Sequence, residues 1–244
     1  GRSLCRDLAD ATDDLLVRLY EDASAGTQRR RRKGAVCLVA VGGYGRRELA
    51  PQSDIDVILV HEKRATGIDE LARALWYPLW DAGLKLGHAV RSIDEHLALA
   101  ADDLETATTL LSGRHLVGDD ELAGRLITGG LTQWRKHSRR WLDGLRSRVI
   151  ERREQAGDVA YLLEPDLKDG HGGLRDVQTL WWAGEADLPL PADDAVVLDR
   201  CYGQLVEVRV ALHRVTGRPG DVLRLELQDA VAEEVGAPSA DGLI

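Results

Sequence analysis

The 244-residue sequence contains neither phenylalanine nor methionine, and we find no physical reason for this absence. It also lacks a run of about 18 apolar residues, which excludes a membrane-spanning helix. No apolar signal-peptide core lies near its N-terminus, so nothing in it predicts export from the cytoplasm. Leu, Val, Ile, Ala and six Trp dominate a hydrophobic content of 44%, which excludes disorder as the main state. The sequence therefore predicts a cytoplasmic globular chain with one large domain or two smaller ones.

Cysteine is scarce as well, and the charge is unbalanced. Cys5, Cys37 and Cys201 are odd in number, far apart and without CxxC spacing, which predicts reduced structural thiols and excludes a zinc site. The formal net charge of −9 repels polyanions, so nucleic acid is not the expected partner. The basic run at residues 29–33 is interpreted as a solvated linker, with a partner- or phosphate-attracting patch as the alternative.

Hydrophobic periodicity divides the chain into two parts with a boundary near residue 100. Residues 1–100 predict an amphipathic helix at 3–23 and an α/β core at 34–100, with strands at 35–41, 55–60 and 84–90 and a helix at 68–80. Ser92 and Glu95 predict a capping box at the start of the next helix. Residues 101–244 are mainly helical, with helices expected at 102–111, 119–127, 133–155, 174–183 and 194–215. The stretch 222–227 is either a strand or the start of a last helix.

Two aspartates lie at the start of the second predicted strand. Asp54 and Asp56 are two residues apart, and such side chains lie on one face of an extended strand. Two neighbouring carboxylates repel each other at neutral pH, and a divalent cation relieves that repulsion. Mg²⁺ takes one or two protein carboxylates and completes its shell with water and phosphate oxygens. Because exposed loops also produce such pairs by chance, the neighbouring residues decide the meaning of this one.

Glycines follow the first predicted strand, as Gly42, Gly43 and Gly45. Without side chains, the backbone amides of such a segment can approach an anion closely, and Arg46 can pair with phosphate oxygens. The segment therefore predicts a metal–nucleotide site, and the alternative is a tight turn whose glycines serve only backbone geometry. The sequence has no GxxxxGK[ST], and Glu48 stands where GxGxxG has its third glycine, which excludes P-loop and Rossmann sites.

Two long motifs resemble those of a known family. Residues 42–56 read Gly-Gly-Tyr-Gly-Arg-x-Glu-Leu-x-Pro-x-Ser-Asp-Ile-Asp, which resembles the nucleotidyltransferase motif of the bacterial PII uridylyltransferase/uridylyl-removing enzyme family. Residues 163–177 resemble that family's Pro-x-Leu-Lys…Gly-Gly-Leu-Arg-Asp-Ile signature. Both motifs stand in the expected order, so the resemblance spans nearly the whole chain. The Gly-Lys-Leu-Gly-Gly variant of the related glutamine-synthetase adenylyltransferases is absent.

The resemblance implies an α+β fold, in which a polymerase-β-like nucleotidyltransferase domain with a mixed sheet precedes a mainly helical domain. It also implies a reaction. UMP (or AMP) would move from UTP (or ATP) to a tyrosine of the trimeric PII nitrogen-signalling protein, with release of pyrophosphate. No residue decides between the two nucleotides.

The resemblance further assigns roles to individual residues. Asp54 and Asp56 would be the catalytic residues and the Mg²⁺ ligands. The nucleotide would be bound by Gly42, Gly43, Arg46, Ser53, Lys168 and Arg175. For the last two residues the alternative is a surface lysine and an arginine paired with Asp176 or Glu164.

Two features of the family pattern are missing. Transferases of this fold usually carry a third carboxylate on a neighbouring strand, and residues 84–91 contain none. His88, Glu164 and Asp176 are the candidate substitutes that would activate the tyrosine hydroxyl, although we favour a packed strand histidine for His88. No His-Asp dipeptide occurs, whereas nucleotide removal in the family needs a His-Asp domain. We therefore expect a fragment that is competent at most for transfer.

Two other functions stay open. A catalytically silent nucleotide-binding or PII-docking module is favoured by the missing third carboxylate and disfavoured by the intact pair Asp54 and Asp56. A small-molecule nucleotidyltransferase of the same fold is disfavoured by the motif at residues 163–177.

Overall fold

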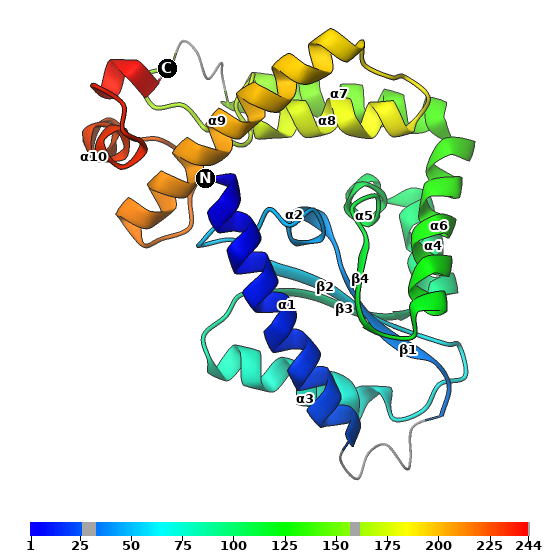
Figure 1. The fold of residues 1–244 in the computed structure, drawn as a ribbon. Coiled ribbons are helices and arrows are strands. Elements are labelled where there is room, and N and C mark those ends of the chain that lie inside the picture. Colours follow the sequence, from blue (N-terminus) through cyan, green and yellow to red (C-terminus); the bar gives the residue numbers. More distant parts are fainter. Residues whose placement is uncertain (26–32, 157–161, 244) are drawn as a thin grey trace. The chain divides into compact units, whose positions relative to one another are not determined.

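The computed structural model describes residues 1–25, 33–156 and 162–243 (Figure 1). Apart from Lys33, the predicted basic run at 29–33 lies outside the described residues. The chain divides into two compact units. The sheet unit comprises Arg6–Leu49 and Ser53–Trp134, and the helical unit comprises Gly1–Cys5, Ala50–Gln52 and Arg135–Ile244. The boundary predicted from the sequence lies near residue 100, whereas the compact units separate after Trp134, because a strand and a helix beyond residue 100 pack on the sheet.

A four-stranded mixed sheet forms the centre of the sheet unit. Its order is β3-β2-β1-β4, from β1 (Val36–Ala40), β2 (Ile55–His61), β3 (Leu86–Ser92) and β4 (Arg114–Gly118). β1 runs antiparallel to β2 and β4, while β2 and β3 are parallel. All five residues of β1 are buried, which explains why this segment is a continuous apolar run. The three predicted strands and the α+β fold class are confirmed, and β4 is an additional strand.

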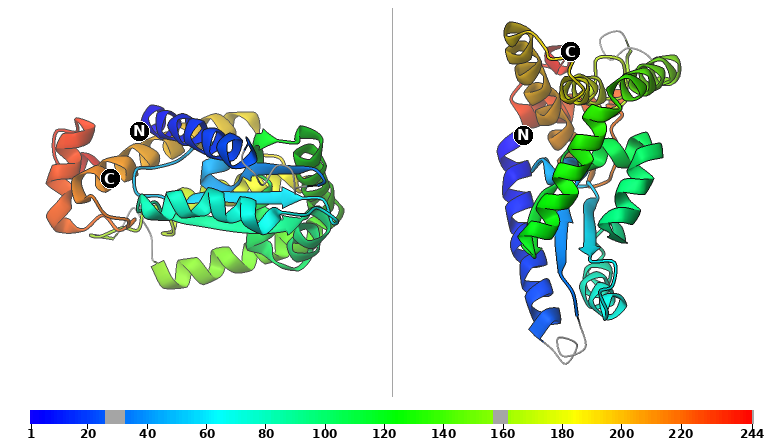
Figure 2. Two further views of the ribbon diagram at one scale, coloured as in Figure 1. Left: turned by 90° about the horizontal axis from the view of Figure 1, so that it is seen from below. Right: turned by 90° about the vertical axis from the view of Figure 1, so that its right-hand side faces the viewer.

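Helices cover both faces of the sheet (Figures 1 and 2). One face packs on α1 (Arg2–Ala25) and α3 (Ile68–Asp81). The other packs on α4 (Ile93–Asp102), α5 (Leu104–Leu110) and α6 (Asp120–Lys136). In β2, Ile55, Val57 and Leu59 belong to the first core, and Ile58 and Val60 belong to the second. This two-residue alternation also fixes the face on which the polar residues of β2 lie.

The helix boundaries follow from local side-chain chemistry. The predicted capping box is present, since Ser92 Oγ accepts from the Glu95 amide at 3.4 Å and Glu95 Oε2 accepts from the Ser92 amide at 2.8 Å. The predicted helix at 102–111 corresponds mainly to α5, because α4 continues to Asp102. The Asp103 carboxylate caps α5 by accepting from the Thr106 amide at 2.7 Å.

The helix break predicted between residues 127 and 133 lies instead between Lys136 and Ser138. α6 continues through Gly129 and Gly130 to Lys136, and α7 (Ser138–Ala156) follows. A Cβ at Gly129 would lie 2.9 Å from Leu97 Cδ1, and one at Gly130 would lie 2.8 Å from Leu110 Cγ. These two glycines therefore allow α6 to pack closely against α4 and α5, and they do not end the helix.

The helical unit contains α7, α8 (Leu174–Glu185), α9 (Ala192–Thr216), α10 (Leu225–Val235) and the 3₁₀ turn η2 (Ala240–Leu243). α8 packs on α9 through Trp181 and Tyr202, whose ring centroids are 4.6 Å apart. The predicted helices at 174–183 and 194–215 are confirmed. The ambiguous stretch at 222–227 divides, because Val222 forms an isolated bridge with Asp166 and α10 begins at Leu225. None of the helices described combines the length and the apolar character that crossing a bilayer requires.

Candidate active site

The glycine motif forms a tight turn directly after β1. Gly42–Gly45 make the short helix α2, in which Gly42 has φ +58° and no side chain caps the first turn. The Gly45 amide donates to Val41 O at 2.9 Å, and a Cβ at Gly45 would overlap the carbonyl oxygen of Ser112. A Cβ at Gly43 would meet nothing closer than Glu48 O at 3.6 Å. Gly45 is therefore required by packing, whereas a Cβ at Gly43 would make only ordinary van der Waals contacts with the described residues.

The Asp56 carboxylate lies between two glycines. In β2, Asp56 follows the alternation of Ile58 and Val60, so it lies on the face of the sheet covered by α4, α5 and α6. Gly87 is its register partner on β3, and a Cβ there would lie 3.3 Å from Asp56 Cγ and well under 3.0 Å from Oδ1. A Cβ at Gly42 would lie 3.2 Å from Asp56 Oδ2. The glycines at both positions thus leave the space in which the carboxylate sits.

Two further predicted residues precede this strand. Ser53 is half-buried and Asp54 is exposed, and the chain is already extended here because the Ile55 amide donates to Lys85 O at 2.9 Å. Asp54 is one residue before β2, so the alternation of the strand assigns it to the side of Asp56.

Arg46 follows the glycine turn and is held in place by two contacts. Its Nε donates to Glu48 Oε2 at 2.8 Å, and its Nη1 donates to Ser112 Oγ at 3.1 Å. The position of a Cβ at Gly43 is 3.9 Å from Arg46 Nη2, so the guanidinium lies beside that glycine. The sheet unit therefore contains six of the eight predicted site residues.

The donor atoms fit a hard cation. Across residues 1–25, 33–156 and 162–243, no group of three or more His, Cys, Asp or Glu side chains is arranged to hold a metal ion. The candidate donors are the carboxylate oxygens of Asp54 and Asp56, and an all-oxygen pair of this kind suits Mg²⁺, which completes its shell with water and phosphate oxygens. Opposite Asp56, on the neighbouring strand β3, the chain has Gly87 and no carboxylate.

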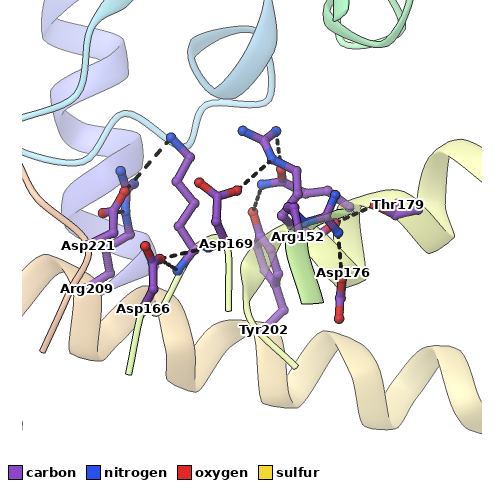
Figure 3. Close-up of polar contacts among 11 residues, drawn as sticks. Arg152, Asp166, Asp169, Asp176, Thr179, Tyr202, Arg209 and Asp221 are labelled. Atoms are coloured by element: carbon purple, nitrogen blue, oxygen red, sulfur yellow. Dashed lines mark hydrogen bonds and ion pairs between the residues drawn. The ribbon is translucent and has the colours of Figure 1, made fainter. Parts of the chain in front are cut away.

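The other two predicted residues, Lys168 and Arg175, lie side by side in the helical unit. The Arg175 amide, in the first turn of α8, donates to Lys168 O at 2.9 Å. Arg175 Nη1 donates to Gln178 Oε1 at 3.0 Å, and its Nε lies 3.6 Å from Asp169 Oδ1. Lys168 Nζ lies 3.9 Å from Asp221 Oδ2. These contacts place both cations next to acidic or polar side chains, of which Asp169 and Asp221 are labelled in Figure 3.

The alternative partners proposed for Arg175 make other contacts. Asp176 Oδ1 accepts from Arg152 Nη2 at 2.6 Å (Figure 3). Its Oδ2 accepts from the Gly172 amide at 3.0 Å. Glu164 Oε1 accepts from the Leu225 amide at 3.0 Å and so begins α10. Both carboxylates of that alternative interpretation thus make contacts that serve local structure.

Asp221 is the anchor of Lys168. It accepts from Arg209 Nε at 2.6 Å (Figure 3). It also lies 3.4 Å from His213 Nε2. Burial alone would raise the pKa of the Asp221 carboxyl, but His213, Arg209 and Lys168 together hold that pKa well below its ordinary value. Asp221 therefore stays ionised and offers Lys168 a fixed negative charge.

His88 does not belong to the site around Asp56. Its ring lies 5.5 Å from that of Trp76 and 5.4 Å from that of Trp80, both on α3. Since α3 covers the face of the sheet opposite to Asp56, His88 lies on the other side of the sheet. The histidine contacts two tryptophan rings as a packed strand residue would, but it is exposed and is not part of the core.

Sequence reasoning missed two neighbours of the predicted residues, Gly87 and Ser112. A glycine inside a strand next to the Asp-x-Asp strand is a usable signal for close approach, and Gly87 carries it. Ser112 has no such signal, because it reaches Arg46 across 66 residues of sequence.

Comparisons with known proteins cover both units. The family model for GlnD PII-uridylyltransferase matches residues 140–243, and the model for the nucleotidyltransferase family DUF294 matches residues 2–88. The bifunctional uridylyltransferase/uridylyl-removing enzyme of Streptomyces coelicolor is 42% identical over 243 residues, which are 98% of this chain and 28% of that protein. The enzyme of the same name from Mycobacterium tuberculosis is 42% identical over 211 residues, 82% of this chain and 26% of that protein.

A third relative of that name, from Bradyrhizobium sp., is 36% identical over 263 residues, 100% of this chain and 28% of that protein. The chain thus spans only about a quarter of the length of these relatives. The mixed sheet with its glycine turn and Asp-x-Asp pair, followed by a helical region, defines a nucleotidyltransferase-type protein. Within that class, the chain belongs to the PII uridylyltransferase/uridylyl-removing enzyme family.

Proposed function

We propose that this chain is a Mg²⁺-dependent protein nucleotidyltransferase of the cytoplasm. It would transfer UMP or AMP from UTP or ATP to a tyrosine of the trimeric PII nitrogen-signalling protein and release pyrophosphate. The observation that carries the proposal is the position of the Asp56 carboxylate, which lies between Gly42 of the glycine turn and Gly87 of β3. Asp54 precedes Asp56 by two residues. The names of the relatives, uridylyltransferase/uridylyl-removing enzyme, support uridylyl transfer as the form of the reaction.

In this proposal the six predicted site residues of the sheet unit have distinct roles. Asp54 and Asp56 hold Mg²⁺, which when bound supplies neutralising charge for the triphosphate. The backbone amides of Gly42 and Gly43 donate hydrogen bonds to phosphate oxygens, and Gly43 has no side chain to obstruct that approach. Ser53 and Arg46 provide supporting contacts, with the guanidinium kept beside Gly43 by Glu48 and Ser112.

Lys168 and Arg175 are proposed to bind negative charge of the nucleotide or of pyrophosphate. Both are partly exposed, with side-chain exposures of 36% and 32%, and their backbones are hydrogen-bonded to each other. Lys168 Nζ lies 3.9 Å from Asp221 Oδ2, which is longer than a hydrogen bond, and Arg175 Nε lies 3.6 Å from Asp169 Oδ1. A phosphate group that binds Lys168 therefore competes with a long ion pair.

The proposal is tested by nucleotide transfer to purified PII protein. The chain is incubated with PII, Mg²⁺ and either α-labelled UTP or α-labelled ATP, and label on PII is measured. We expect label with one of the nucleotides, and a fall of at least about 100-fold for Asp54→Asn and for Asp56→Asn, because each removes a charge from the proposed metal site. Asp69→Asn, an exposed aspartate on α3, is the matched control and keeps wild-type transfer.

A second candidate function is a catalytically silent nucleotide-binding or PII-docking module. It is favoured by Gly87, which stands opposite Asp56 where a third carboxylate would complete the site. That function predicts nucleotide binding with no label on PII under any effector condition. Unchanged transfer by both aspartate variants would instead refute the assignment of the catalytic residues.

A further inference from the structure

A network centred on Asp13 holds the glycine turn from the side of α1 and β4, through Tyr44 and Arg114. Arg47 Nη2 lies farther from the same carboxylate, at 3.8 Å. Tyr44 Oη donates to Asp13 Oδ1 at 2.5 Å. Arg114 donates to both oxygens of the same carboxylate, from Nη1 to Oδ2 at 2.6 Å and from Nη2 to Oδ1 at 3.0 Å. One aspartate on α1 thus ties together the turn after β1 and the edge strand β4.

Arg114 also contacts the backbone of the turn directly. Its Nε donates to Gly45 O at 3.2 Å and its Nη2 donates to Tyr44 O at 3.3 Å. Its guanidinium carbon lies 5.5 Å from the centre of the Tyr44 ring. The guanidinium therefore links the carbonyl end of α2 to the carboxylate of Asp13, and its planar fork is suited to such paired contacts.

The network is largely shielded from water. Tyr44 is 1% exposed, and the side chains of Asp13 and Arg114 are 17% and 21% exposed. Burial and the hydrogen bond to Asp13 raise the pKa of Tyr44 well above its ordinary value, so its hydroxyl remains a donor at neutral pH. Because the partners are shielded, removing one of them leaves another buried polar group without its partner.

The turn depends on such support. A four-residue helix is not stable in isolation, since forming its first hydrogen-bonded turn costs more than it returns. Gly42 and Gly43 add flexibility, because glycine loses more conformational freedom on ordering than any other residue. The same glycines are the ones proposed to receive phosphate oxygens. The network therefore acts on the least self-supporting part of the proposed site.

We propose that Asp13 and Arg114 are positioning residues that fix the glycine turn in the conformation that binds the nucleotide. This inference rests on the proposed function. A merely structural network would lower the melting temperature and leave the KM for nucleotide unchanged in the folded protein. A positioning network raises that KM and loosens the turn while the protein remains folded.

The test uses Asp13→Asn, which removes the charge, Arg114→Lys, which removes the fork, and Tyr44→Phe, which removes only the hydroxyl. Asp10→Asn is the matched control, because Asp10 lies on the same helix and pairs with Arg47 of the same turn at the exposed surface. We measure the KM for nucleotide and kcat for label transfer to PII, the melting temperature, and hydrogen exchange of amides 42–49.

For Asp13→Asn and Arg114→Lys we expect the KM for nucleotide to rise by about 10- to 100-fold with a smaller change in kcat, together with faster exchange of the turn. Tyr44→Phe raises the KM for nucleotide and the exchange rate of the turn by smaller amounts. Asp10→Asn changes neither the KM nor the exchange rate. The positioning role is overturned if the wild type is active and the Asp13 and Arg114 variants have the wild-type KM for nucleotide and the wild-type exchange rate of the turn. A wild type without nucleotide binding or transfer refutes the proposed function instead, and exchange of the turn then still shows whether the network fixes it.

Discussion

The substitution Gly87→Ala adds one methyl group next to the Asp56 carboxylate of the proposed site. The added methyl group would lie closer than 3.0 Å to Asp56 Oδ1 and 3.3 Å from Asp56 Cγ. Contacts under 3.0 Å are essentially not made by real Cβ atoms, so either the carboxylate or the strand must move. Gly87 and Asp56 are register partners in the parallel pair of β2 and β3, which resists a shift of the backbone. The carboxylate is therefore displaced, by about 1 Å.

A displacement of this size in a catalytic group costs about 100-fold in rate. Label transfer from UTP or ATP to PII is the assay, with Gly43→Ala and Gly124→Ala measured beside Gly87→Ala. Gly124 is exposed on α6 with nothing within 4 Å of its Cβ position, so its variant keeps wild-type activity. Gly43→Ala meets no protein atom closer than 3.6 Å, and it loses transfer only because its methyl group obstructs the nucleotide.

The overpacking at Gly87 also costs about 1–3 kcal/mol of folding free energy, which a urea titration measures separately. Activity is therefore compared at temperatures where all variants are folded. Wild-type transfer by folded Gly87→Ala would refute the reasoning, because it would show that the position of the Asp56 carboxylate does not matter to the reaction.

Two further predictions concern stability. Gly45→Ala places a methyl group on the carbonyl oxygen of Ser112, and it should destabilise the protein by about 1–3 kcal/mol or more in a urea titration; a stability equal to that of Gly124→Ala would contradict this. His96 is 3% exposed, and burial, followed by the nearby Arg91, lowers its pKa to about 4. The unfolded chain therefore takes up a proton below about pH 6.5 that the folded protein does not, and stability should fall by about 2 kcal/mol between pH 7 and pH 5 on this account. His96→Leu should lack that fall, and an unaltered pH dependence in the variant would disprove the assignment.

Local chemistry made much of the fold predictable. The apolar run at 35–41 identified β1, and Ser92 with Glu95 identified the start of α4, because a buried strand and a capping box depend on neighbouring residues only. The Asp-x-Asp pair and the glycine turn were predictable for the same reason. The structure then distinguishes Gly45, which packing requires, from Gly43, which it does not.

Long-range contacts set the features that the sequence did not reveal. β4 has only five residues without clear alternation, and its pairing with β1 joins segments about 75 residues apart. Gly129 and Gly130 resemble a helix break, but they allow close packing on Leu97 and Leu110. The network of Asp13 and Arg114 links residues 101 positions apart, so no local pattern indicates it.

The central claim is that Asp54 and Asp56 hold a divalent cation together with a nucleoside triphosphate at the glycine turn. Electron paramagnetic resonance with Mn²⁺ as the probe tests it without PII, by measuring free Mn²⁺ during titration with the chain and UTP or ATP. The account predicts that wild-type protein depletes free Mn²⁺ in the presence of one nucleotide beyond what the nucleotide alone binds, and that Asp54→Asn and Asp56→Asn abolish this depletion. Equal depletion by wild type and both variants would contradict it.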